Sequence, residues 1–106
     1  MNIMKIMQQA GKMKSKMQEM QVRMHDETVV GESGGGLVKV TMGCSFDPKE
    51  VKLDKSVVNP AEIELLEDMI KAAISDAHKK ASARVEGETK KIMKELGLPE
   101  NMDMPF

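Results

Sequence analysis

The first quarter of the chain carries apolar residues at alternating intervals of three and four residues. This spacing places apolar side chains along one face of an α-helix, as in a coiled coil. The seven positions are Ile3, Ile6, Ala10, Met13, Met17, Met20 and Met24. The pattern predicts a helix over residues 2–24, about 33 Å long, whose apolar face packs against another helix.

The pattern then changes to the shorter apolar runs that are typical of β-strands. These runs are residues 28–30, 37–42 and 51–53. In the middle run the residues alternate, so that Val38 and Val40 point to one face of a sheet. Because the connections between the runs are short, we expect a three-stranded antiparallel meander over residues 27–54.

A glycine-rich segment, Gly-Glu-Ser-Gly-Gly-Gly-Leu at residues 31–37, separates the first two runs. It looks superficially like a phosphate-binding loop, but it lacks the Gly-Lys-Ser/Thr ending and opens a strand instead of a helix. We therefore interpret it as a hairpin turn that needs positive φ angles or close backbone approach.

A second helix is predicted after the sheet. Asn59 is a favoured N-cap, Pro60 suits the first helical position, and Glu62 can reach back to the cap backbone. A helical apolar stripe then continues until Gly97, which precedes Leu-Pro and is a typical stop signal. The element order, helix, three strands and long helix, predicts an α+β fold.

The boundaries of this second half follow from the same signals. We expect the long helix to cover residues 60–96, and a loose tail to cover residues 98–106. Gly87 lies inside the helix, where glycine costs about 1 kcal/mol relative to alanine. A bend or break in the helix would therefore occur near this residue.

The composition predicts a weak core within one copy of the chain. The 106 residues include twelve Met but only two Phe, with no Trp or Tyr. Methionine fills gaps but specifies packing weakly, and the edges of a three-stranded sheet invite pairing with a second copy. We therefore expect a homodimer. Its core and dimer interface would draw on Met13, Met17, Met20, Val38, Val40, Leu66 and Ile70.

The formal net charge is −1, but the charges are unevenly distributed. The first helix is basic, and the second helix is acidic in its first turns and basic in its second half. If the two helices pack antiparallel, their basic ends meet and form a phosphate-binding surface. The candidate DNA-binding residues are Lys5, Lys12, Lys14, Lys16, Arg23, Lys90, Lys91 and Lys94, followed by Lys79, Lys80 and Arg84. The alternative is a solvated face whose charges suit the helix dipole.

Residues for catalysis or cofactor binding are sparse. One cysteine, Cys44, and two histidines, His25 and His78, give too few ligands for a metal site. We expect no metal, no cofactor, no small-molecule substrate and no enzymatic activity. A lone cysteine fits a cytoplasmic protein, and no apolar run is long enough for a membrane span. With so few aromatic residues, stacking on single-stranded nucleic acid is disfavoured, whereas duplex binding through phosphates is not.

Several segments together resemble the YbaB/EbfC nucleoid-associated proteins, and the resemblance covers nearly the whole chain. The most specific are the glycine-rich hairpin within residues 28–41 and the helix segment Leu-Leu-Glu-Asp-Met-Ile at 65–70. The others are Asn2–Lys5, Val51–Asp54, the Ala pair at 72–73, Asp76–Ala77 and the Met-Pro-Phe ending at 104–106.

The resemblance implies a bacterial or plastid protein that associates with the nucleoid and affects its organisation and gene expression. It also implies a tweezer-like homodimer whose protruding helical arms contact duplex DNA. The resemblance also suggests that many members carry a few more residues before the position of Asn2; if such residues contact DNA, this chain would bind weakly or with little sequence preference. We expect binding mainly through phosphates. The alternative is a Met-rich helical module that binds other proteins.

Overall fold

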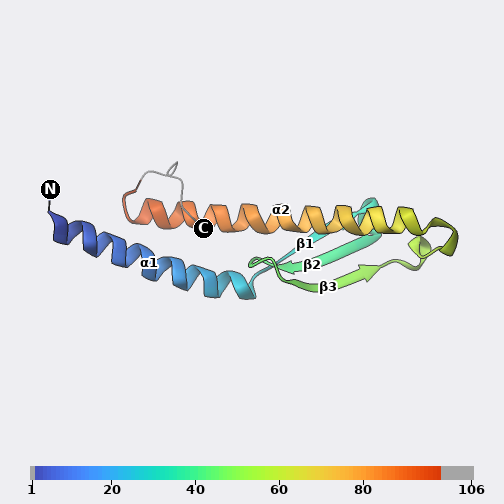
Figure 1. Cartoon of the computed structure of the whole chain (residues 1–106), viewed down its shortest axis with the longest axis horizontal. Coiled ribbons are helices and arrows are strands. Elements are labelled where there is room, and N and C mark those ends of the chain that lie inside the picture. Colours follow the sequence, from blue (N-terminus) through green and yellow to red (C-terminus); the bar gives the residue numbers. More distant parts are fainter. Residues whose placement is uncertain (1, 99–106) are drawn as a thin grey trace.

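The computed structural model describes residues 2–98 and shows two helices and one sheet (Figure 1). In chain order the main elements are α1 (Ile3–Asp26), β1 (Thr28–Ser33), β2 (Val38–Gly43), β3 (Pro48–Leu53) and α2 (Ile63–Glu95). The strands form one antiparallel sheet in the order β1-β2-β3. The predicted α+β class and element order are confirmed.

Several boundaries differ from the predicted ones, beginning with α1, which ends at Asp26 and not at residue 24. Strand β3 already begins at Pro48. Asn59 does act as a cap, because its Oδ1 accepts a hydrogen bond from the Ala61 amide at 3.0 Å, but the turn that it caps is a 3₁₀ turn. The α-helix therefore begins at Ile63 and then passes through Gly87 without a break. From residue 99 on, the predicted tail lies outside the described residues.

Helix α2 has two different partners along its length (Figure 1). Its first half crosses one face of the sheet, where Ala73, Ala77 and Ala81 are fully buried against Val38 and Val40. Alanine side chains are short, so the helix axis can approach the strands closely. The helix covers β1 and β2 and leaves the same face of β3 largely uncovered.

The glycine-rich segment has two roles in this packing. A Cβ atom on Gly31 would lie 2.2 Å from the carbonyl oxygen of Ala73, so only glycine allows β1 to approach α2 this closely. Residues 34–36 form the turn between β1 and β2, and all three glycines there have positive φ angles. The predicted hairpin turn is thus confirmed, and both conformational reasons for glycine apply.

The second half of α2 packs antiparallel to α1. We call the pair formed by α1 and residues 85–95 the arm (Figure 1). Its core contains Met17, Met20 and Met24 from α1 together with Ile92 from α2. The predicted helix-to-helix packing of the methionine face is therefore present in this part of α1.

The first turns of α1 are an exception to that packing. Lys16 of α1 lies beside Glu95, the last residue of α2, and Met13 still packs against the arm core, whereas the first turns of α1 project beyond the end of α2 (Figure 1). Ile3 is 72% exposed and Ile6 is 46% exposed. The expectation that the apolar face is packed along the whole of α1 is wrong for these turns, because α2 ends too early to cover them.

Candidate nucleic-acid interface

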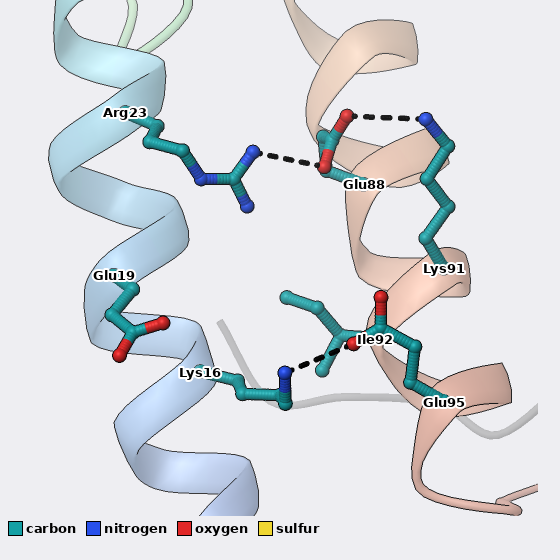
Figure 2. A pocket seen from close by; sticks show the side chains of 7 residues that line it. All are labelled: Lys16, Glu19, Arg23, Glu88, Lys91, Ile92 and Glu95. Carbon is teal, nitrogen blue, oxygen red and sulfur yellow. Dashed lines mark hydrogen bonds and ion pairs between the residues drawn. The ribbon is translucent and has the colours of Figure 1, made fainter.

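A charged groove runs between the two helices of the arm (Figure 2). It has a volume of about 290 Å³ and is lined by Lys16, Glu19, Arg23, Glu88, Lys91, Ile92 and Glu95. We call it the arm groove. Lys16 Nζ lies 3.0 Å from Glu95 Oε2, and Arg23 Nη1 lies 3.3 Å from Glu88 Oε2. Both pairs join α1 to α2, so they fix the lengthwise register of the two helices.

Glu88 is the centre of this network. It is only 5% exposed, yet its carboxylate faces Arg84, Arg23 and Lys91, the last at 3.6 Å. The hydrogen bond from Arg84 is the main cause that holds the Glu88 pKa below its usual range, against the opposing effect of burial. Removing Arg84, whose hydrogen bond has the largest effect, would leave this buried carboxylate less well compensated.

Arg84 connects this network to the sheet. Its second guanidinium nitrogen lies 2.9 Å from Glu27 Oε1, just before β1, and its first bonds Glu88. Both carboxylates raise the Arg84 pKa further, the hydrogen bond to Glu88 most of all. Arg84, a second-choice candidate for DNA contact, is thus engaged within the protein and holds the arm to the sheet.

Lys80 is also engaged within the protein. Its Nζ donates to the Val30 carbonyl at 2.8 Å, and Asp76 Oδ2 accepts from the Glu32 amide at 3.0 Å. These bonds satisfy backbone groups on the outer edge of β1. The edge of β1 is therefore blocked by side chains of α2, which is one way in which proteins prevent strand pairing. Lys79 is exposed beside it.

The first-choice candidates do not gather on one side of the arm. Four of them are spaced by seven, four and seven residues on α1, and this spacing repeats on one flank of a helix. We call them the basic flank: Lys5, Lys12, Lys16 and Arg23. Lys16 and Arg23 line the arm groove, so this flank borders the groove.

The remaining candidates lie elsewhere. Lys14 shares its side of α1 with Gln18, Gln21 and His25, which line a different hollow. Lys90 and Lys94 are each two residues from Ile92, and residues two apart point about 200° apart on a helix. They therefore lie on the side of α2 away from α1. This placement overturns the expectation that Lys5 and Lys12 lie beside Lys90 and Lys94, and Lys91 shares the arm groove with Lys16 and Arg23 instead.

The residues considered for catalysis or metal binding, Cys44, His25 and His78, contact the segment that connects β2 to β3 or belong to it. Cys44 is 1% exposed, and burial raises its thiol pKa, so the thiolate that a nucleophile requires is disfavoured. His25 Nδ1 lies 3.2 Å from Ser45 Oγ, and the His78 ring stacks on Phe46 with a centroid distance of 4.6 Å. Cys44 and the two histidines therefore have local structural roles.

An apolar surface remains uncovered beside the sheet. Val51 and Leu53 of β3 lie opposite Val40 and Val38 in register and share their face, but they are 51% and 39% exposed. Ile70 and Ile74 of α2 line an adjoining hollow of about 320 Å³. We call Val51, Leu53, Ile70 and Ile74 the β3–α2 face.

The seven predicted core positions differ in burial. Met17, Met20, Val38 and Val40 are buried within this single chain. Met13, Leu66 and Ile70 are partly buried and pack against the buried clusters. Glu27 and Glu88 were not predicted to be functional or structural residues. The sequence does contain a signal for Glu88, because Arg84 and Lys91 lie four residues before and three residues after it, where both can form ion pairs with it on a helix.

Comparison with known proteins places this arrangement in a family. The model of the YbaB/EbfC DNA-binding family matches residues 1–96. The chain belongs to this family. A nucleoid-associated protein of a Bradyrhizobium species is 45% identical over 94 residues, with 89% of each chain covered. One from Paramagnetospirillum magneticum is 43% identical over 105 residues, covering 99% of this chain and 98% of the relative.

A solved structure shares the fold of this YbaB/EbfC member. A crystal structure of an uncharacterized protein from Helicobacter pylori has a TM-score of 0.76 and 17% identity, and the match covers 88% of this chain and 98% of that one. The family is described as DNA-binding, and the relatives named here are nucleoid-associated proteins. None of the helices described here is long and apolar enough to cross a membrane.

Proposed function

We propose that this protein binds double-stranded DNA as a homodimer, mainly through phosphate contacts and with low sequence specificity. The observation that carries the proposal is the elongated arm, which presents basic side chains along a molecule that is 68 Å long. Within residues 2–98, Lys5, Lys12 and Lys14 form no ion pair and are exposed. Free cations on a projecting helix are suited to phosphate contacts.

The homodimer is supported by the β3–α2 face. An apolar surface of this kind is commonly an interaction site in a soluble protein. The edge of β1 is blocked by Lys80 and Asp76, whereas within residues 2–98 no strand pairs with the outer edge of β3. A second copy that packs on the β3–α2 face would bury Val51, Leu53 and Ile74. The two arms of such a dimer would then project from a shared body, like tweezers.

Low specificity is supported by the chemistry of the arm. Its cations are lysines and one arginine, and the described residues form no base-reading motif such as a helix-turn-helix. Phosphate contacts position a protein on a duplex but carry no sequence information. A cytoplasmic protein that binds in this way would associate with the nucleoid, contribute to its organisation and influence gene expression.

A fluorescence anisotropy titration with three labelled ligands tests this proposal. They are a duplex of about 30 base pairs, a scrambled duplex of the same composition, and one of the single strands. We expect the two duplexes to bind with similar affinity and the single strand to bind more weakly. Failure to bind either duplex at low salt would overturn the proposal.

A second candidate function is the binding of another protein through the start of α1. Ile3, Met4 and Met7 are each more than two-thirds exposed at the end of the arm. Met17 and Met20 are buried in the arm, however, and form no open Met-rich groove for another protein, which disfavours this alternative relative to DNA binding. Protein binding at this end would persist at high salt, whereas phosphate contacts would not.

A further inference from the structure

The sides of the arm differ in their suitability for DNA. The basic flank extends over about 27 Å from Lys5 to Arg23 at 1.5 Å per residue, and it has Lys91 of α2 across the groove. The side with Lys14 carries Gln18, Gln21, Val22, His25 and Asp26 around its hollow, and thus has few cations. Of these two sides of α1, the basic flank carries more cations, although Glu19 lies between Lys16 and Arg23.

Carboxylates within the arm pair with some cations of the basic flank. Glu95 holds Lys16, whose side chain is 42% exposed, and Glu88 holds Arg23, whose side chain is 54% exposed. Figure 2 shows both acids reaching from α2 toward the cations of α1. A phosphate that approaches Lys16 must displace or tolerate the Glu95 carboxylate, which has the same sign of charge.

We infer that the duplex lies against the basic flank, and that Glu95 competes with DNA phosphates for Lys16. This inference rests on the proposed function. It adds which side of the arm contacts the duplex, and that a carboxylate of the protein competes with DNA for one of the cations. Glu95 is the relevant acid because its side chain is 58% exposed, whereas the buried Glu88 is held by three cations and serves the fold. The pair between Lys16 and Glu95 lowers the affinity for DNA in favour of a fixed arm.

Lys12 and Lys14 provide a matched pair of variants to test which side of α1 the duplex contacts. Both are exposed lysines on α1, two residues apart, and neither forms an ion pair with another residue in the described range. Lys12→Ala should weaken duplex binding roughly 5- to 10-fold per lost contact at 0.1 M salt, from the counterion-release slope of about −0.9 per phosphate. Lys14→Ala should change binding less than about twofold, because screening at this salt acts over about 10 Å.

Glu95 and Glu86 provide a matched pair of variants to test whether Glu95 competes with DNA phosphates for Lys16. Each acid pairs with one lysine, but Glu86 pairs with Lys90 on the side of α2 away from α1, at 3.6 Å. Glu95→Gln and Glu86→Gln change the net charge equally. We expect Glu95→Gln to tighten duplex binding at least about threefold more than Glu86→Gln, because it frees a cation of the basic flank.

The experiment is one anisotropy titration of the unmodified protein and all four variants into the same labelled duplex of about 30 base pairs at 0.1 M salt. Equal effects of Lys12→Ala and Lys14→Ala, with binding by the unmodified protein intact, would overturn the assigned side alone. Equal effects of Glu95→Gln and Glu86→Gln would overturn the competition. If the unmodified protein does not bind, the proposed function fails and this inference fails with it.

Discussion

Arg23 and Glu88 are 65 residues apart in the sequence, yet Arg23 Nη1 lies 3.3 Å from Glu88 Oε2 across the two helices of the arm. The same carboxylate bonds Arg84, which also reaches Glu27 beside the first strand. One buried acid therefore links α1 and α2 directly and, through Arg84, is connected to Glu27 just before β1. This acid helps to hold the arm in its direction relative to the sheet.

Replacing Glu88 should therefore destabilise the fold in a pH-dependent way. Glu88→Gln should reduce the free energy of unfolding at pH 7 by about 2 kcal/mol, the scale of a hydrogen bond to a charged group. The folded-state pKa of Glu88 is lowered by Arg84, so its stabilisation is present above the unfolded pKa, about 4.3. It is lost as the pH falls through the folded pKa.

Urea denaturation of both proteins at several pH values checks this prediction. The difference in unfolding free energy should shrink as the pH is lowered from about 5 toward 3. Glu86→Gln is the control, because the Glu86 side chain is 68% exposed and pairs only with Lys90 among residues 2–98. A difference for Glu88→Gln that stays constant over this pH range would contradict the role assigned to its charge.

Gly31→Ala should be strongly destabilising. The added methyl group would lie 2.2 Å from the Ala73 carbonyl oxygen and 2.3 Å from the Ala77 amide nitrogen. Both are backbone atoms that cannot move without shifting α2 away from β1, so the cost should be at least roughly 1–3 kcal/mol. Thermal unfolding followed by circular dichroism measures it.

Two helical glycines serve as controls for that change. A Cβ atom on Gly11 or Gly87 would meet nothing within 4 Å. Alanine has the higher helix propensity, so Gly11→Ala or Gly87→Ala should stabilise the protein by up to about 1 kcal/mol. If all three substitutions had the same effect, the close approach of β1 to α2 would not be what requires glycine at position 31.

The β3–α2 face predicts a substitution that separates the two copies. Val51→Lys places a charge on an exposed apolar side chain of this face and should shift the protein from dimer to monomer at micromolar concentration. Val22→Lys is the matched control, because Val22 is 69% exposed on the arm and outside this face. Sedimentation equilibrium distinguishes the two. An unmodified protein that is monomeric, or a Val51→Lys variant that stays dimeric, would contradict the proposed interface.

The blocked edge of β1 predicts a local change in hydrogen exchange. The Glu32 amide donates to Asp76, and this bond is the main cause of the lowered Asp76 pKa. In Asp76→Ala the amide of Glu32 should exchange faster, while amides in the centre of β2 remain protected. Exchange followed by NMR tests this. Unchanged protection of Glu32 would mean that the edge is covered by some other contact.

Much of the fold is predictable from local patterns. The heptad spacing on α1, the alternation of β2 and the three turn glycines each depend on a few neighbouring residues, and the structure confirms the elements that they predict. The start of α2 was misplaced by three residues because the Asn59 cap serves a 3₁₀ turn equally well.

The candidate site is less predictable, because it depends on the register between distant segments. Nothing near Lys16 in the sequence indicates that it meets Glu95. The roles of Lys80 and Arg84 depend on contacts with β1 and with Glu27 just before it. Spacing alone does place Lys5, Lys12, Lys16 and Arg23 on one flank. The exposure of Ile3 depends on where α2 ends, which no pattern within α1 reveals.

The salt dependence of duplex binding tests the central claim most directly. The association constant of the unmodified protein for a duplex of about 30 base pairs would be measured from about 50 to 300 mM salt. Arms that bind phosphates should give a slope of log K against log salt of about −3 to −6, at −0.9 per neutralised phosphate. A slope near zero, or no binding at the lowest salt, would contradict the claim that the basic arms bind duplex DNA.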